Sequence, residues 1–182
     1  MQIRPACPDD FDELNYFYIR MNEVINVRNN DYNPDNAVFP SADMIRAAIS
    51  NGGQFVGIED GIIAVACIVC HDSEPAYSGV DWKVHAGKDE FWILHALRVA
   101  PEYEGRGFAK QMLRYLIDLG PKRGQKAIRL DVLEGYAVER LYYPFGFVYI
   151  ATVEMLYEDI GYPKRFRLFE KDLTGDTSTL NG

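Results

Sequence analysis

The sequence has little of what would mark a membrane, secreted or nucleic-acid-binding protein. No apolar run approaches the ~20 residues needed to cross a bilayer, and the opening residues MQIRPACPDD lack the basic and apolar regions of a secretory signal. Three cysteines are too few, and odd in number, for a disulfide framework. Acidic residues outnumber basic ones by 27 to 19, which argues against nucleic-acid binding as the main task. We therefore expect a cytoplasmic protein with no membrane or nucleic-acid partner, whose net charge of −8 suits a cationic or amine substrate.

The scarcity of cysteine and histidine also argues against a metal or haem group. The stretch CIVCH, residues 67–71, matches the spacing of a haem attachment motif. It lies at the end of GIIAVACIVCH, which is typical of a buried strand, where residues three apart point to opposite faces. The two thiols could not both reach one haem, and a zinc site would need ligands from a second cluster. We expect Cys67 and Cys70 to be core residues, with no metal and no haem bound.

What the sequence does contain is a regular succession of strands and helices. Its 182 residues suit one domain, expected over residues 1–172, with a flexible tail over 173–182. Strands are predicted at 1–6, 54–58, 62–70, 90–99, 127–133, 145–158 and 164–173, with a hairpin turn at 59–61. Helices are predicted at 7–26, 41–50, from 107 onward, and at 136–143. A polar, irregular insertion occupies 72–88. This order predicts an α/β fold with a mixed sheet of about seven strands and helices on both faces.

A glycine-rich turn connects the strand at 90–99 to an amphipathic helix. Gly105 and Gly107 stand in PEYEGRGFAK, directly before apolar residues at helical spacing. A helix start offers unpaired N–H groups and partial positive charge, and glycine lets the backbone wrap an anion such as a pyrophosphate. The turn is neither a Walker A loop nor a Rossmann fingerprint. An ordinary tight turn is the alternative interpretation.

At this turn the chain resembles the GNAT superfamily of N-acetyltransferases. That family carries [QR]-x-x-G-x-[GA] between its fourth strand and third helix, and EGRGFA at 104–109 occupies the same place. Downstream, LYYPFGF at 141–147 is similar to the family's L-Y-x-x-x-G-F. The order of elements also matches, so the resemblance covers roughly residues 2 to 172 and implies the GNAT fold.

The resemblance implies where acetyl-CoA, as cosubstrate, should bind. The backbone of Leu97, Arg98 and Val99 should pair with the pantetheine arm, in a slot where the fourth and fifth strands splay apart. The pyrophosphate should lie on the segment that follows, made up of Gly105, Arg106, Gly107, Phe108, Ala109 and Lys110.

Two residues depart from the family pattern. Glu104 replaces the usual Gln or Arg and would repel the pyrophosphate if its side chain turned inward, although Arg106 and Lys110 could offset the charge. Gly135 replaces an Asn found in many members, which affects a pantetheine contact.

Two side chains are the catalytic candidates. Tyr142 occupies the tyrosine position of L-Y-x-x-x-G-F, which in the family is the general acid for the CoA thiolate; a packed tyrosine is the alternative. His95 stands in HALRV, similar to H-x-L-x-V of the serotonin N-acetyltransferase branch, where a histidine relays the proton. An imidazole titrates near neutral pH, as a base requires. Ile93 replaces that branch's second histidine, and a hydrogen-bonded core role for His95 is the alternative.

Other ionisable residues have weaker support. The carboxylates Glu90, Asp131 and Glu134 are alternative bases, each with a structural or solvated role as the simpler interpretation. His71 and His85 have no motif support, and Asp81 and Trp82 are candidates for lining an amine pocket, with an ordinary surface loop as the simpler interpretation.

The resemblance implies an N-acetyltransferase that acts on a primary amine by direct attack in a ternary complex. A non-catalytic acyl-CoA-binding module of the same fold, or an enzyme that acetylates a protein, are the alternatives. The acceptor pocket should be built from the variable segments 26–40, 72–88 and 157–165, none of which identifies the amine. Because dimers are common in this family, the resemblance also allows a homodimer, although no stretch of the sequence specifies an interface.

Overall fold

The computed structural model describes residues 1–29, 38–156 and 163–175. These ranges include all or most of the residues of every predicted strand and helix. The strands are β1 (Gln2–Pro5), β2 (Gln54–Glu59), β3 (Ile62–Cys70), β4 (Phe91–Val99), β5 (Ala127–Leu133), β6 (Val148–Met155) and β7 (Lys164–Asp172). The helices are α1 (Phe11–Asn29), α2 (Ala42–Ser50) and α3 (Phe108–Leu119). Among the described residues, no helix is long and apolar enough to cross a membrane.

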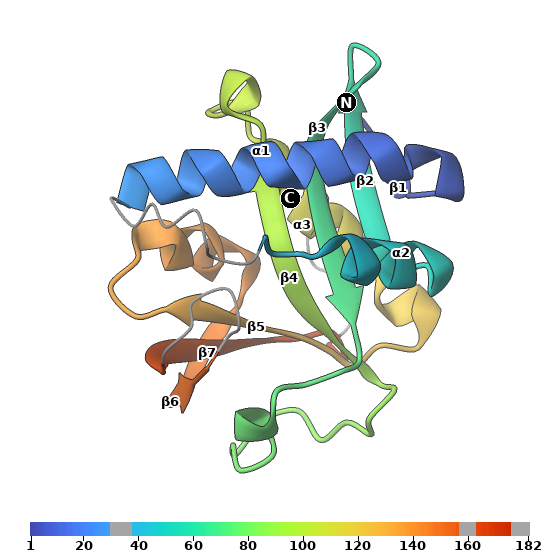
Figure 1. Cartoon of the computed structure of the whole chain (residues 1–182). Coiled ribbons are helices and arrows are strands. Elements are labelled where there is room, and N and C mark those ends of the chain that lie inside the picture. Colours follow the sequence, from blue (N-terminus) through green and yellow to red (C-terminus); the bar gives the residue numbers. More distant parts are fainter. Residues whose placement is uncertain (30–37, 157–162, 176–182) are drawn as a thin grey trace.

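The strands form one mixed sheet in the order β1-β2-β3-β4-β5-β7-β6. All neighbours pair antiparallel except β4 and β5, which run parallel. Helices α1 and α2 cover one face and α3 the other (Figure 1). The seven-stranded sheet with helices on both faces confirms the predicted α/β fold.

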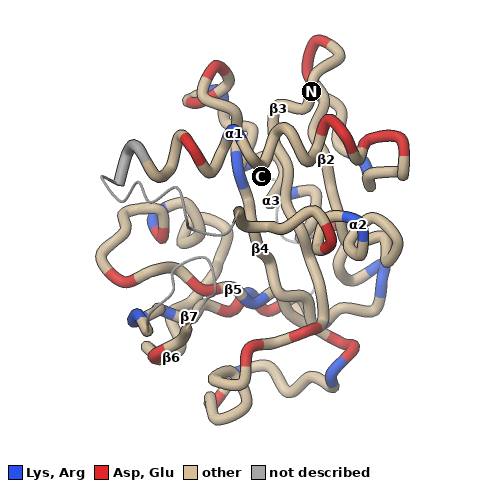
Figure 2. The backbone as a smooth tube through the Cα atoms, viewed as in Figure 1, with Lys and Arg blue, Asp and Glu red and all other residues tan. Residues whose placement is uncertain are grey.

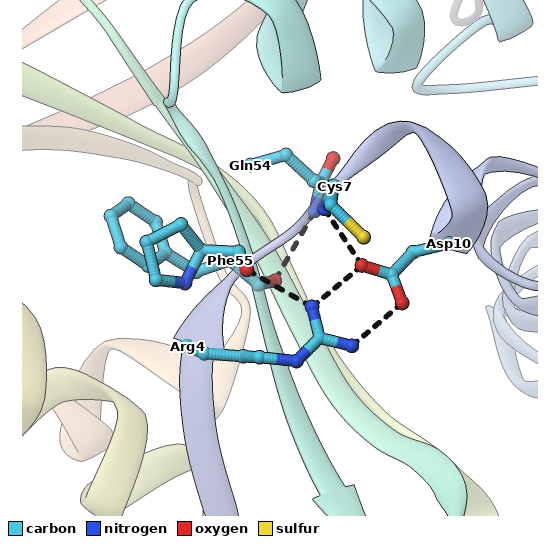
Figure 3. Close-up of polar contacts among 6 residues, drawn as sticks. Arg4, Cys7, Asp10, Gln54 and Phe55 are labelled. Atoms are coloured by element: carbon cyan, nitrogen blue, oxygen red, sulfur yellow. Dashed lines mark hydrogen bonds and ion pairs between the residues drawn. The ribbon is translucent and has the colours of Figure 1, made fainter.

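Local sequence signals account for two connections between elements, the β2–β3 hairpin and the turn before α1. Between β2 and β3, Asp60 and Gly61 have φ values of 53° and 79°, as a two-residue hairpin turn requires. Before α1, a short 3₁₀ turn (η1, Pro8–Asp10) begins with a proline, and Asp10 accepts a hydrogen bond of 2.7 Å from the Cys7 backbone N–H. Arg4 of β1 holds the same carboxylate with two bonds of 2.6 and 2.7 Å (Figure 3). The Arg4 guanidinium keeps the pKa of Asp10 far below its ordinary value.

The insertion between β3 and β4 has a small core of its own. Tyr77, from the 3₁₀ turn η2 (Pro75–Tyr77), and Val84 are buried against Phe91 and Ile93 of β4 and against residues of β7. Its Trp82 packs against Tyr77 with ring centroids 5.3 Å apart and donates a hydrogen bond to the Tyr77 carbonyl. The segment predicted as irregular is thus fixed on the sheet.

A buried ion pair holds this insertion to the sheet. Arg129 of β5 and Glu170 of β7 lie side by side in the strand register, and Nε of the arginine is 3.0 Å from Oε1 of the glutamate. Their side chains are only 6% and 1% exposed. Glu170 also accepts from the Val84 N–H, and Arg129 donates to the Val84 carbonyl, both at 3.0 Å. The guanidinium lies over the rings of Phe91 and Trp82, at 4.0 and 4.3 Å.

The α-helix predicted at 136–143 is wrong. The segment instead forms two short 3₁₀ turns, η5 (Ala137–Leu141) and η6 (Tyr143–Phe145). Pro144 lacks the N–H that a continuing helix would need, so the chain tightens here and ends at Gly146, with φ of 77°. Of the predicted tail, residues 176–182 lie outside the described residues, as do parts of the expected acceptor segments.

Candidate active site

The glycine-rich turn is shaped as a strand-to-helix junction with its backbone exposed. A 3₁₀ turn, η3 (Pro101–Tyr103), follows β4, and Gly105 and Gly107 then take φ values of 75° and 77°. Gly107 is the N-cap of α3 and offers no side chain to the first-turn N–H groups. A Cβ added at either glycine would meet nothing within 4 Å. The turn therefore presents open space in front of the positive end of a helix, which suits an anion.

One charged side chain of this turn, that of Arg106, pairs with the neighbouring hairpin. Arg106 lies 2.6 Å from Glu59 at the β2–β3 hairpin, and its guanidinium packs over the rings of Phe108 and Tyr103. Its side chain is thus directed to the hairpin, and not to the N–H groups of α3. Glu104 and Lys110 are exposed. Ala109 stands in the first turn of α3 and Phe108 is buried.

Strands β4 and β5 pair only at their beginnings. Their ladder consists of three residue pairs, of which Ile93–Arg129 is the last. β4 continues along β3 to Val99, and β5 continues along β7 to Leu133. Residues 94–99 and 130–133 therefore diverge, and Figure 1 shows the two strands opening from a common start. We call this opening the wedge.

A bulge shapes the β4 side of the wedge. Ala66 and Ile68 of β3 pair with Arg98 and His95, so two residues of β4, Ala96 and Leu97, stand opposite one of β3. Ala96 has a φ of 51°, which is uncommon for a residue with a side chain. The bulge turns the peptide groups near Leu97 out of the regular ladder. The sequence contains no glycine there that would have predicted it.

His95 lies half-buried at the bulge, on the sheet face covered by α1 and α2. Its ring meets that of Phe39 edge-on, with centroids 6.4 Å apart. Burial lowers the pKa of the His95 imidazole, and the charge of Asp131 opposes this effect. The imidazole is therefore neutral at neutral pH and able to accept a proton.

Tyr142 caps the end of η5 and is 8% exposed. Its ring packs edge-on against Phe147, with centroids 5.5 Å apart. Burial raises the pKa of Tyr142 to about 12, while the nearby Arg98 guanidinium favours the phenolate. The hydroxyl thus stays protonated over the physiological range. His95, Tyr142 and Asp131 share one electrostatic environment, since the Asp131 charge acts on both.

A cleft of about 800 Å³ opens beside His95. Its walls come from the start and body of α2, the end of β3 and the first residues of the insertion, and they include Phe39, Met44, Ile68 and Leu156. Asp72 and Glu74 stand at the insertion end, and Figure 2 shows acidic residues on the segment that leaves β3. Burial and the Asp131 charge raise the pKa of Glu74. The cleft combines an apolar wall with the carboxyl groups of Asp72 and Glu74 at the insertion end and the guanidinium of Arg123 elsewhere in the lining. Parts of two predicted acceptor segments border it.

The other ionisable candidates have structural partners. Glu90 pairs with Lys126 at 2.7 Å, and Glu134 with Arg165 at 3.3 Å. Asp131 accepts a hydrogen bond of 2.8 Å from the Tyr77 hydroxyl.

The remaining candidate residues are exposed or have packing roles. The Nδ1 of His71 donates to the Phe91 carbonyl at 2.7 Å. His85, Asp81 and Gly135 are exposed. Trp82 packs in the core of the insertion, as described above, and Cys67 is buried in β3.

The chain is similar to known acetyltransferases in sequence pattern and in fold. The sequence matches the model of the acetyltransferase (GNAT) family over residues 21–147. No protein in a set of curated sequences matches it.

Solved structures with the same fold cover nearly the whole chain. A GNAT-family acetyltransferase of Streptococcus agalactiae is 22% identical with a TM-score of 0.74, over 94% of each chain. YncA of Salmonella typhimurium, solved with its cofactor acetyl-CoA, is 17% identical with a TM-score of 0.68, over 98% of this chain and 96% of its own. The ribosomal-protein-alanine N-acetyltransferase of Brucella melitensis is also 17% identical with a TM-score of 0.68, over 94% and 99%.

Proposed function

Since this chain belongs to the GNAT acetyltransferase family, we propose that it transfers the acetyl group of acetyl-CoA to a primary amine, by direct attack in a ternary complex. The observation that carries the proposal is the wedge, which begins beside His95 and leads to the helix start at Gly107. The charges of Arg98 and Asp131, on its two strands, act on Tyr142. A structure of the same fold has been solved with acetyl-CoA, which supports this cosubstrate.

The chain's own residues fit the cosubstrate. The open space at Gly105 and Gly107 lets a pyrophosphate approach the backbone N–H groups of residues 107–110. The edge of β4 at Leu97, Arg98 and Val99 faces the wedge and offers main-chain groups to an extended amide-bearing arm, as a sheet edge offers them to an added strand. Lys110 adds positive charge beside the phosphates, and the exposed Glu104 side chain reaches solvent. Arg106 contributes by bracing the turn against Glu59.

In the proposed reaction each of the two candidate residues has one role. The amine nitrogen attacks the thioester carbon, so that an N–C bond forms and the C–S bond breaks. His95 accepts the proton that the nitrogen loses. The backbone N–H near Leu97 stabilises the negative charge on the carbonyl oxygen, and Tyr142 donates its proton to the departing sulfur. Proton exchange with solvent restores both side chains.

The cleft supports an acceptor with an apolar body and a cationic amine. Its apolar wall at Phe39, Met44 and Ile68 suits a hydrocarbon, and the negative end at Asp72 and Glu74 attracts an ammonium group.

Acetyl-CoA should stabilise the protein against heat. At about a hundredfold excess over its dissociation constant it should add about 2.7 kcal/mol, which corresponds to a rise in Tm of roughly 5 to 11 °C for a chain of this size. The measurement is a thermal shift assay. Gly107→Val should abolish the shift, because its side chain fills the open space where the phosphates would bind.

Gly124→Val is the matched control. Gly124 has a φ of 76° and open space around it, in the turn before β5, so its substitution imposes similar backbone strain. The Gly124 variant should keep the ligand-induced shift. If acetyl-CoA causes no shift in the unchanged protein, both catalysis and simple acyl-CoA binding are ruled out.

His95→Ala should remove the acidic limb of the pH–rate profile. Activity should fall as the pH drops through the pKa of His95, because the protonated imidazole cannot accept a proton. Burial places this limb below the ordinary histidine value of about 6.5. Thiol release from acetyl-CoA, measured over pH with a panel of amines, gives the profile. His85→Ala, at an exposed histidine, should keep the limb; a limb that survives in His95→Ala would reject His95 as the base.

A further inference from the structure

We propose that Asp131, held by the hydroxyl of Tyr77, is a positioning residue that faces His95 across the wedge and supports its protonated imidazole. This inference rests on the proposed acetyl transfer for its catalytic meaning. The electrostatic coupling between Asp131 and His95 can be measured without any enzymatic turnover.

Strand register places the two side chains on the same face of the sheet. Ile93 and Arg129 are the last paired residues of β4 and β5. His95 and Asp131 each follow two residues later, and residues two apart in a strand point to the same side. Because β4 and β5 diverge from this level, His95 and Asp131 stand on the two walls at the start of the wedge. This is the face on which the insertion and the cleft lie.

Tyr77 fixes the carboxylate from the insertion. Its hydroxyl donates a hydrogen bond of 2.8 Å to Oδ2 of Asp131. Tyr77 itself is 3% exposed, packs on Trp82, and accepts the Trp82 indole N–H at its carbonyl. The ion pair of Arg129 and Glu170 anchors the same insertion through Val84. The orientation of Asp131 thus depends on residues far from it in sequence.

The surrounding charges make Asp131 the carboxylate that acts on His95. The titratable and charged groups around the wedge and the adjoining end of the cleft come from several elements. They are Asp131 on β5, Glu74 and Tyr77 on the insertion, Cys67 and Cys70 on β3 with His71 and Asp72 after it, Arg98 on β4, Tyr18 on α1, and Tyr142 after η5. Asp131 raises the pKa of His95 against the effect of burial. Burial and, to a smaller extent, the Asp131 charge raise the pKa of Glu74. The Tyr77 hydroxyl holds the Asp131 carboxylate in place through its hydrogen bond.

The role follows from these contacts. When His95 takes a proton from the attacking amine, a positive charge forms in a partly desolvated site. A fixed carboxylate on the opposite wall stabilises that charge without itself touching the substrate.

The test is the titration of His95 in the ligand-free full chain, followed by NMR of the imidazole. The protein has three histidines, so His95→Ala identifies the signal. Asp131→Asn should lower the pKa of His95 by at least about one pH unit, since loss of the negative charge disfavours the imidazolium. In the enzymatic assay the acidic limb should move to lower pH by the same amount, and kcat should fall. Asp118→Asn, at an exposed position on α3, changes the net charge equally and should leave the titration unchanged.

A second variant covers the case in which Asp131→Asn does not fold. Tyr77→Phe keeps the carboxylate and removes its hydrogen bond, so it should lower the pKa of His95 by a smaller amount. A His95 titration equal to that of the unchanged protein in either folded variant would overturn the proposal. If the pKa of His95 changes in the variants but no amine is acetylated, the coupling between Asp131 and His95 is confirmed and the proposed function is wrong. The two outcomes can therefore be distinguished.

Discussion

Replacing Tyr142 by phenylalanine should lower kcat by about two orders of magnitude or more, the range expected for a general acid, with little change in the Kd for acetyl-CoA. The hydroxyl is the only group removed, and the ring keeps its packing against Phe147. Because burial raises the pKa of Tyr142 to about 12, the side chain remains protonated in neutral solution and can supply a proton to the thiolate. An alkaline limb due to Tyr142 should accordingly be absent below about pH 11.

Single-turnover rates and calorimetric binding of acetyl-CoA would measure the two quantities separately. Tyr143→Phe is the matched control, because Tyr143 is the neighbouring tyrosine, is 44% exposed and packs on Phe169. It should keep nearly full activity. Equal losses of turnover and of acetyl-CoA binding in Tyr142→Phe would remove Tyr142 as the acid.

Arg129→Met should reduce the free energy of unfolding by about 3–5 kcal/mol, the usual cost of breaking a buried ion pair. The substitution leaves the Glu170 carboxylate buried at 1% exposure without its cation, and it removes the hydrogen bond to the Val84 carbonyl. For a chain of this length the loss corresponds to a fall in Tm of roughly 6 to 20 °C. Denaturant titration followed by circular dichroism measures it. Fluorescence of Trp82, over which the guanidinium lies, reports on the insertion.

The pair formed by Lys126 and Glu90 provides the control. Its side chains are 44% and 42% exposed, so Lys126→Met should cost only a small fraction of the loss expected for Arg129→Met. In addition, Arg129→Met combined with Glu170→Met should recover part of the stability, because no unpaired charge remains. Similar losses at the buried and the exposed pair would show that the pair of Arg129 and Glu170 does not hold the insertion in place.

The elements that the sequence predicted correctly are those set by local physics. Asp60 and Gly61 predict their hairpin because few residue pairs accept the required φ values. Gly107 predicts the start of α3 in the same way, and the apolar face of α3 is buried as its periodicity indicates. The apolar pattern at 136–143 predicts a short helix, but Pro144 lacks the N–H that an α-helix would need, and the segment forms 3₁₀ turns.

The parts that could not be predicted depend on contacts between distant residues. Arg106 suggested a phosphate ligand by its place in the glycine-rich turn, but Glu59, 47 residues earlier, holds its side chain. Tyr77 carries no motif, and it gains a role only because the fold brings it to Asp131, 54 residues later. The bulge at Ala96 likewise arises from the pairing with β3, and no glycine in the sequence predicts it.

The wedge also has a consequence for the protein without its ligand. Residues 94–99 and 130–133 form two strand edges inside the sheet, and main-chain groups on such edges tend to recruit any extended segment that reaches them. An ordinary sheet exposes its edges only at its margins, where charge and short strand length discourage association. In the proposed enzyme these additional edges flank the site of acetyl transfer, so they have to stay open for the substrate to enter. If acetyl transfer takes place in the wedge as proposed, we expect the ligand-free protein to self-associate through these edges, and we expect bound acetyl-CoA to protect it during purification and storage.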